Sequence, residues 1–184
     1  MVMIMTIEIL NNTIDNNNNI DAPLKENIKE LIVIFNKMFP GVDLTNLNNR
    51  LATLKIEKSN KLMNKRVSKY NPVTNILEFN VDKIEQGYDM KYVMMYELLN
   101  IITSNSESFG FCKNNNFSAL NAGYTAILAN NLVGNDSEIP FLEDEIISTN
   151  LISLLVGDEV MMESYFTNNV NLLANALLSE GVEL

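Results

Sequence analysis

The stretch Lys91-Tyr-Val-Met-Met-Tyr-Glu-Leu-Leu-Asn-Ile-Ile-Thr103 decides how the rest of the chain is interpreted. Its apolar side chains point in almost every direction around a helix, which is the pattern of a helix buried in the middle of a domain. The exceptions are Tyr96, Glu97 and Asn100, which share one stripe because positions 96 and 100 are one helical turn apart. Burying an unpaired carboxylate is costly, so Glu97 must face a cleft, water or a partner.

The composition excludes several functions. The chain of 184 residues contains no histidine, which removes Ser-His-Asp catalysis and imidazole metal ligands. A formal net charge of -10 argues against nucleic-acid and acidic-membrane partners. Cys112 is the single cysteine, so an internal disulfide is ruled out. No apolar run is long enough to span a bilayer and the start lacks signal-peptide features, so we expect a soluble, by default cytoplasmic protein.

The length fits one domain preceded by a short extension. We expect residues 1–20 to form an N-terminal strand or a flexible tail, because the asparagine-rich segment 11–19 has too few apolar groups to order itself. Residues 21–184 are expected to form a single domain, with a helix and a sheet in 21–87 and a helical part in 88–184.

Hydrophobic periodicity predicts the elements of the first half. Apolar residues at helical spacing indicate a helix over 23–38, with Asp21 as its cap. Alternating apolar and polar residues predict strands over 51–58 and 76–81, and the segment 70–75 between them has the chemistry of a hairpin turn. These strands predict a small antiparallel or mixed sheet.

The second half is predicted to be helical. Gly157 and Asp158 are expected to end one helix and to cap the next. Because helices follow the sheet and do not alternate with strands, the order of elements indicates an α+β fold. The predicted helices cover 90–103, 118–132, 140–156 and, in one or two pieces, 158–178.

The segment 91–103 resembles the active-site helix of zincin metallopeptidases. In that family a His-Glu-x-x-His motif places two zinc-binding imidazoles and a general-base glutamate on one helix. Here Tyr96 stands at the first histidine position, Glu97 at the glutamate and Asn100 at the second histidine position.

A second segment, Leu120-Asn-Ala-Gly-Tyr-Thr-Ala126, is similar to the Asn-Glu-Gly-x-Thr-Glu sequence that supplies the third ligand in gluzincin-type peptidases. Ala122 replaces the glutamate that would bind zinc, and Ala126 replaces the acidic residue that usually supports a ligand. The matching frame residues are Asn121, Gly123 and Thr125.

The resemblance implies a zincin-like α+β fold with an N-terminal helix, a small twisted sheet, a central active-site-type helix and a C-terminal helical lobe. It also implies a vestigial site without metal or other cofactor, since tyrosine, asparagine and alanine cannot replace three zinc ligands. We therefore expect no enzymatic activity. The vestigial site comprises Tyr96, Glu97, Asn100, Ala122 and Ala126.

The resemblance favours a catalytically inactive metallopeptidase-like protein that binds an unknown peptide or protein, as a binding or regulatory module. Zincin-type clefts hold extended peptides against an edge strand, and this mode of binding survives loss of the metal. The candidate binding residues are Ile76, Glu78, Asn80, Tyr96 and Glu97.

Other interpretations remain open. In a structural or assembly subunit the cleft has closed, with Ala122 and Ala126 letting two helices approach and Tyr96 filling the vacated metal space. The chain could also be an unrelated α+β domain of unknown function, or an enzyme with new chemistry around Glu97, Tyr96 and Cys112. An open cleft beside Glu97 would favour the binding module, and a packed interior the structural subunit.

Overall fold

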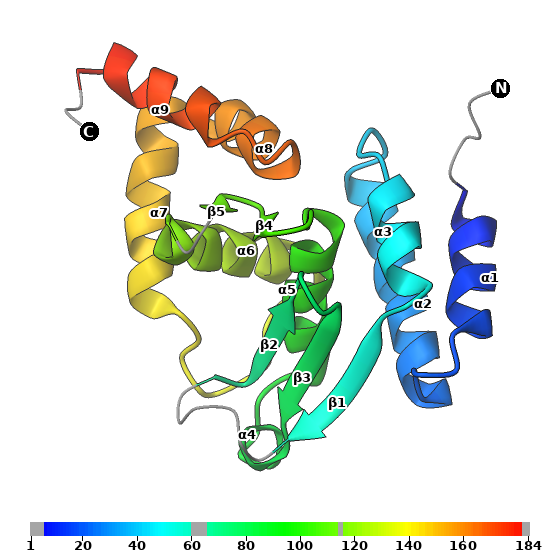
Figure 1. The fold of residues 1–184 in the computed structure, drawn as a ribbon. Coiled ribbons are helices and arrows are strands. Elements are labelled where there is room, and N and C mark those ends of the chain that lie inside the picture. The colour runs from blue at the N-terminus through cyan, green and yellow to red at the C-terminus, as the bar shows by residue number, and fades with distance from the viewer. Residues whose placement is uncertain (1–5, 60–65, 114–115, 182–184) are drawn as a thin grey trace, which may run out of the picture.

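The structure, a computed structural model, describes residues 6–59, 66–113 and 116–181. It has an α+β fold, as predicted, with a small sheet set among helices. In Figure 1 the helices α1, α2 and α3 lie together on one side, α7, α8 and α9 lie on the other, and α5 lies between the two groups.

The N-terminal segment is a helix, so the prediction of a strand or flexible tail over residues 1–20 is wrong where the chain is described. Helix α1 (Ile7–Asn16) begins at Thr6, whose hydroxyl accepts a hydrogen bond from the Ile9 N–H at 3.3 Å. Leu10 and Ile14 are fully buried, and α1 packs against α2 and α3. Their spacing of one turn lets α1 bury an apolar face despite its many asparagines. Residues 1–5 lie outside the described residues.

Helix α2 (Ala22–Met38) confirms the helix predicted over 23–38, and Asp21 precedes it as its N-cap residue. Helix α3 (Thr45–Leu51) was not predicted. It buries Leu47 and Leu51, and it includes the residue at which the first strand was expected to begin. That strand, β1 (Lys55–Ser59), therefore starts later than predicted.

Within the described residues the main sheet has three strands, in the order β1-β3-β2. Strand β3 (Ile76–Asn80) pairs parallel with β1 and antiparallel with β2 (Ser68–Asn71), so the sheet is mixed, as one of the predicted alternatives. The hairpin turn predicted over 70–75 joins β2 to β3, with Asn75 at a φ of 54°. The peptide-binding mode expected at Ile76, Glu78 and Asn80 requires an edge strand, but β3 is the central strand.

The predicted helices of the second half are present. Helix α7 starts at Glu143, later than the expected Pro140, and Gly157 both ends α7 and caps α8, a role predicted for Asp158. Gly157 can serve both helices because its φ of 86° suits glycine. The remaining bounds are α4 (Val81–Glu85), α5 (Met90–Ile102), β4 (Ser108–Phe109), β5 (Cys112–Lys113), α6 (Ser118–Val133), α7 (Glu143–Val156), α8 (Asp158–Phe166) and α9 (Val170–Ser179).

Helix α5 is the central helix of the fold, as its sequence predicts. Almost all of its side chains are buried, including Glu97 and Asn100. It packs against α2, α3, α6 and strand β2, and the Asp89 carboxylate caps its first turn by accepting from the Lys91 N–H at 2.8 Å. The polar stripe of α5 is therefore enclosed by both halves of the chain.

Candidate functional site

Glu97 is buried, with 2% of its surface exposed. The Ser68 hydroxyl on β2 donates to its Oε1 at 2.6 Å, and the Asn100 Nδ2 donates to its Oε2 at 3.1 Å. The carboxyl group also accepts a backbone hydrogen bond from Tyr70. The sequence required that Glu97 face a cleft, water or a partner. The structure shows polar partners inside the protein.

A directional chain of hydrogen bonds leads from a backbone amide to Glu97. The Phe111 N–H donates to Asn121 Oδ1 at 3.0 Å, and Asn121 Nδ2 donates to Asn100 Oδ1 at 3.3 Å. Asn100 Nδ2 then donates to Glu97 Oε2. A backbone N–H can only donate, so it fixes the orientation of both amides. Glu97 Oε2 is therefore the acceptor at the end of this chain.

Burial raises the pKa of Glu97 above its ordinary value, because the charged form loses its hydration. The hydrogen bonds from Ser68 and Asn100 and the positive charge of the exposed Arg66 act in the opposite direction on this pKa, but burial outweighs them. The carboxyl group is thus an internal acceptor whose charged form is held at a free-energy cost.

Tyr96 is half-buried on α5, and its ring meets the ring of Phe141 edge-on at a centroid distance of 5.4 Å. Phe141 precedes α7 and makes similar contacts with Tyr92, at 5.3 Å, and Tyr88, at 6.3 Å. Burial, and then the neighbouring Glu97, raise the pKa of Tyr96 well above its usual value. The phenol therefore stays neutral and packs as an aromatic side chain beside Glu97.

Helices α5 and α6 run antiparallel where the two predicted segments meet. Asn100 contacts Asn121, and the Tyr92 hydroxyl donates to the Ala126 carbonyl at 3.3 Å, so ascending numbers on α5 meet descending numbers on α6. Ala126 is fully buried and Ala122 is half-buried. Glu97, Asn100 and Asn121 are thus brought together, whereas a meeting of Tyr96 with Ala122 stays a prediction.

The frame residues that carry the zincin resemblance each have a packing role. Asn121 belongs to the hydrogen-bond chain described above. A side chain at Gly123 would collide with the backbone carbonyl of Glu145 and the hydroxyl of Thr149, so glycine allows α7 to approach α6 closely. Thr125 shares a hydrogen bond of 2.8 Å with the Tyr165 hydroxyl.

Sequence reasoning missed Ser68 and Gly110, which complete this polar interior together with Thr103 at the end of the polar stripe of α5. Ser68 binds the carboxylate from a strand, and the Thr103 hydroxyl accepts from the Gly110 N–H at 2.9 Å. Gly110 has a φ of 51°, and an added side chain would meet Asn121 and the Tyr165 ring. A glycine between two phenylalanines hints at such a close approach, but nothing in the local sequence marks Ser68.

The binding residues proposed on the sheet do not border an open strand edge. The backbone of β3 pairs with β1 through residues 76–80 and with β2 through 76–79. Asn80 is 5% exposed and its side chain caps α4 by accepting from the Lys83 N–H at 3.2 Å, whereas Ile76 and Glu78 are half-buried. Addition of a peptide strand along β3 is therefore excluded by its two neighbours.

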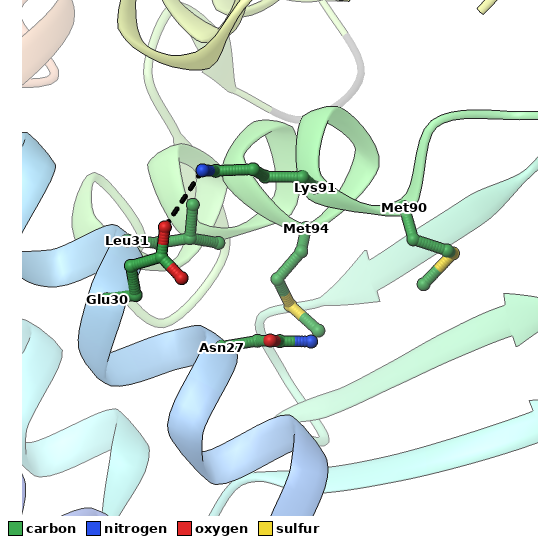
Figure 2. A pocket seen from close by; sticks show the side chains of 6 residues that line it. All are labelled: Asn27, Glu30, Leu31, Met90, Lys91 and Met94. Carbon is green, nitrogen blue, oxygen red and sulfur yellow. Dashed lines mark hydrogen bonds and ion pairs between the residues drawn. The ribbon is translucent and has the colours of Figure 1, made fainter. Parts of the chain in front are cut away.

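A hollow of about 80 Å³ lies between α2 and α5. Figure 2 shows the ion pair between Lys91 and Glu30, at 2.8 Å, reaching across it beside Met90 and Met94. Its lining does not include Tyr96, Glu97 or Asn100, so it is not the cleft that a peptidase would use. The remaining lining residues are Asn27 and Leu31.

In the part of the chain that the structure describes, no three histidine, cysteine, aspartate or glutamate side chains are grouped to hold a metal ion. No helix among residues 6–59, 66–113 and 116–181 combines the length and apolar character needed to cross a membrane. No protein-family model, curated protein or solved structure matches the chain.

Proposed function

We propose that this chain is a non-catalytic structural or assembly protein, in which the position of a peptidase active site has become part of the core. The observation that carries the proposal is the state of Glu97. Its two oxygens accept hydrogen bonds from Ser68 and Asn100, and 2% of its surface is exposed. A general base must reach a water molecule or a substrate. This carboxylate is instead occupied by the protein itself.

The surroundings of Tyr96 support the same proposal. Phe141 covers its ring, and the chain segment that carries Phe141 leads directly into α7. The polar stripe of α5 is thus closed on one side by an aromatic contact and on the other by β2 and α6. A packed interior favours a structural subunit over a peptide-binding cleft.

Strand addition at the β1 edge of the sheet is also disfavoured. Strand β1 lies at an edge, and its side chains Lys55, Glu57 and Lys58 are exposed. Charged side chains on an edge strand oppose pairing with another strand. The peptide-binding alternative was based on residues of β3, which is not an edge strand.

A zincin-like origin remains part of the proposal. It is supported by the order of a helix, a mixed sheet, a central helix and further helices, and by the antiparallel meeting of α5 with α6. Asparagine at position 100 keeps a polar contact across the two helices where the family places its second histidine.

The test is an incubation of the full chain with a mixed-sequence peptide library, with and without added zinc, followed by mass spectrometry. We expect no cleavage above that of the matched variant Glu97→Gln. Cleavage by the wild type that Glu97→Gln abolishes would overturn the proposal, because Glu97 would then act as a base.

A further inference from the structure

Helix α7 is apolar in composition but largely exposed. It carries seven isoleucine, leucine and valine residues between Glu143 and Val156, yet its single buried residue is Thr149. A helix that is apolar on most sides is normally enclosed by other elements. In Figure 1, α7 lies at the outer side of the molecule, beside α6.

The exposed side chains of α7 form one stripe. They lie at the spacing i, i+4, i+7 and i+8, which places them on one face of a helix. The opposite face, marked by Thr149, packs against Gly123 of α6. The α7 stripe consists of Ile147, Leu151, Leu154 and Leu155, which are 54%, 60%, 82% and 52% exposed.

Acidic residues stand at both ends of the α7 stripe. Glu143 and Asp144 occupy the first turn of α7, and Asp158 and Glu159 follow its last turn; all four are exposed. Charge is also distributed unevenly along the whole sequence. Residues 114–184 contain ten acidic residues and no lysine or arginine, whereas residues 1–113 contain thirteen of each sign, so the later part supplies the full net charge of -10.

A hollow of about 510 Å³ adjoins the end of the stripe. Leu154 forms an apolar part of its lining, and Asn150 and Asp158 supply an amide and a carboxylate. The Ser153 hydroxyl holds Asp158 by donating to its Oδ1 at 2.6 Å. A lysine or arginine side chain fits this lining, because its stem can pack on Leu154 while its charge reaches Asp158.

We propose that the α7 stripe binds an amphipathic helix of another protein, with an apolar face flanked at both ends by lysine or arginine. The apolar contacts match a helix-in-groove mode of recognition, and the flanking charges complement the acids at both ends of α7. This inference names the partner class for the assembly role and rests on the proposed function.

Charge disfavours two other possible occupants of the α7 stripe, a second copy of this chain and an anionic lipid surface. A second copy of this chain would bring its own acidic ends against those of the first in either orientation of the two helices, and like charges oppose such an interface. An anionic lipid surface would be repelled by the same residues. A basic partner helix is the occupant that satisfies both the apolar stripe and its acidic flanks.

The experiment uses two synthetic helical peptides and the full chain. Both peptides carry the same leucine stripe, and they differ only in having lysine or glutamate at both ends. Fluorescence anisotropy should show binding of the lysine-flanked peptide that weakens as salt is raised, because salt screens the flanking charges. The glutamate-flanked peptide should bind at least about tenfold more weakly.

Two variants test the position of the binding surface. Leu154→Ser should weaken binding of the lysine-flanked peptide by roughly tenfold or more, as expected for a central contact. Val73→Ser is the matched control, since Val73 is 73% exposed in the β2–β3 turn and should leave binding unchanged. Both positions are exposed, so neither variant should unfold, which thermal denaturation of each will verify.

Several results would overturn the inference: no binding of the lysine-flanked peptide, equal binding of both peptides, or equal effects of the two variants. A dimer in analytical ultracentrifugation that Leu154→Ser dissociates would assign the stripe to a second copy. Leu154-dependent partition onto phosphatidylcholine/phosphatidylglycerol vesicles would assign it to membranes. Each of these leaves the proposed function standing, whereas Glu97-dependent cleavage of the library would remove that function whatever the peptides do.

Discussion

Replacing Glu97 by alanine or by glutamine separates the effect of its hydrogen bonds on stability from the effect of its charge. Alanine removes the acceptor of the Ser68 hydroxyl and the Asn100 amide, which lie at 2.6 and 3.1 Å, and of the Tyr70 backbone N–H. Each buried donor left without a partner costs roughly 1–3 kcal/mol, and removal of the buried charge offsets part of that. We expect Glu97→Ala to lower the free energy of unfolding by about 2–4 kcal/mol at neutral pH.

Glutamine retains the shape of the side chain and one acceptor. Its amide oxygen can accept from Asn100, and its amide nitrogen can donate to Ser68, whose hydroxyl then rotates to accept. The direction of the hydrogen-bond chain from Phe111 is preserved. We expect Glu97→Gln to change the free energy of unfolding by less than about 1 kcal/mol at neutral pH.

The stabilities of the wild type and of Glu97→Gln should respond differently to pH. The pKa of Glu97 is raised in the folded state, so the folded wild type holds this proton more tightly than the unfolded chain. Its contribution to stability is complete below the ordinary value of 4.5 and is lost as the pH rises through the folded-state pKa. Glutamine does not titrate. The stability of Glu97→Gln relative to the wild type should therefore increase as the pH rises from 4.5 through the folded-state pKa of Glu97.

The measurement is urea unfolding followed by circular dichroism, because the chain contains no tryptophan. Both proteins are measured from about pH 5 to about pH 8, and the difference between them cancels the titration of all other groups. A difference that stays constant, or that moves in favour of the wild type as the pH rises, would refute burial as the dominant influence on Glu97.

Three further predictions concern packing and the origin of the site. Gly123→Ala should lower the free energy of unfolding by about 1–3 kcal/mol, because the added methyl group meets the α7 backbone; an unchanged melting temperature would contradict the close approach. Asn17→Ala should cost roughly 1–3 kcal/mol, because two carbonyl groups lose their donor, and hydrogen exchange should report faster opening of α1. The triple variant Tyr96→His, Asn100→His and Ala122→Glu should bind zinc in calorimetry, because an inherited backbone frame fixes the ligand angles. The wild type should contain no stoichiometric zinc. Failure of the variant to bind zinc would count against the zincin origin.

The elements that the sequence predicted well are those whose pattern is local. The helix over 23–38 has an apolar face and a proline in its first turn, and both act within a few residues; Asp21 occupies the N-cap position, but its side chain makes no capping hydrogen bond. The central helix was predicted because side chains apolar on every side require burial. The hairpin turn between β2 and β3 was predicted from its asparagines and proline for the same local reason.

The errors occurred where distant parts of the chain decide the outcome. Helix α1 was missed because its asparagines have weak helical preference, and its stability comes from burying Leu10 and Ile14 against α2 and α3. The place of residues 76–80 at a sheet edge was mistaken, because β3 pairs with β1 as well as with its hairpin neighbour β2. Strand order depends on contacts made across the sheet, which alternation along one strand does not encode.

For the candidate site, the sequence by itself determined the absence of histidine chemistry, the polar stripe of α5 and the requirement that Glu97 find a partner. Only the tertiary structure decided which partner it is, because Ser68 lies on a strand far from Glu97 along the chain, and Asn121, which orients Asn100, lies on another helix. Likewise the sequence determined that α7 is apolar, and only the packing of the other helices left its stripe exposed. A side chain's chemistry is local, whereas its burial is set by every element that packs around it.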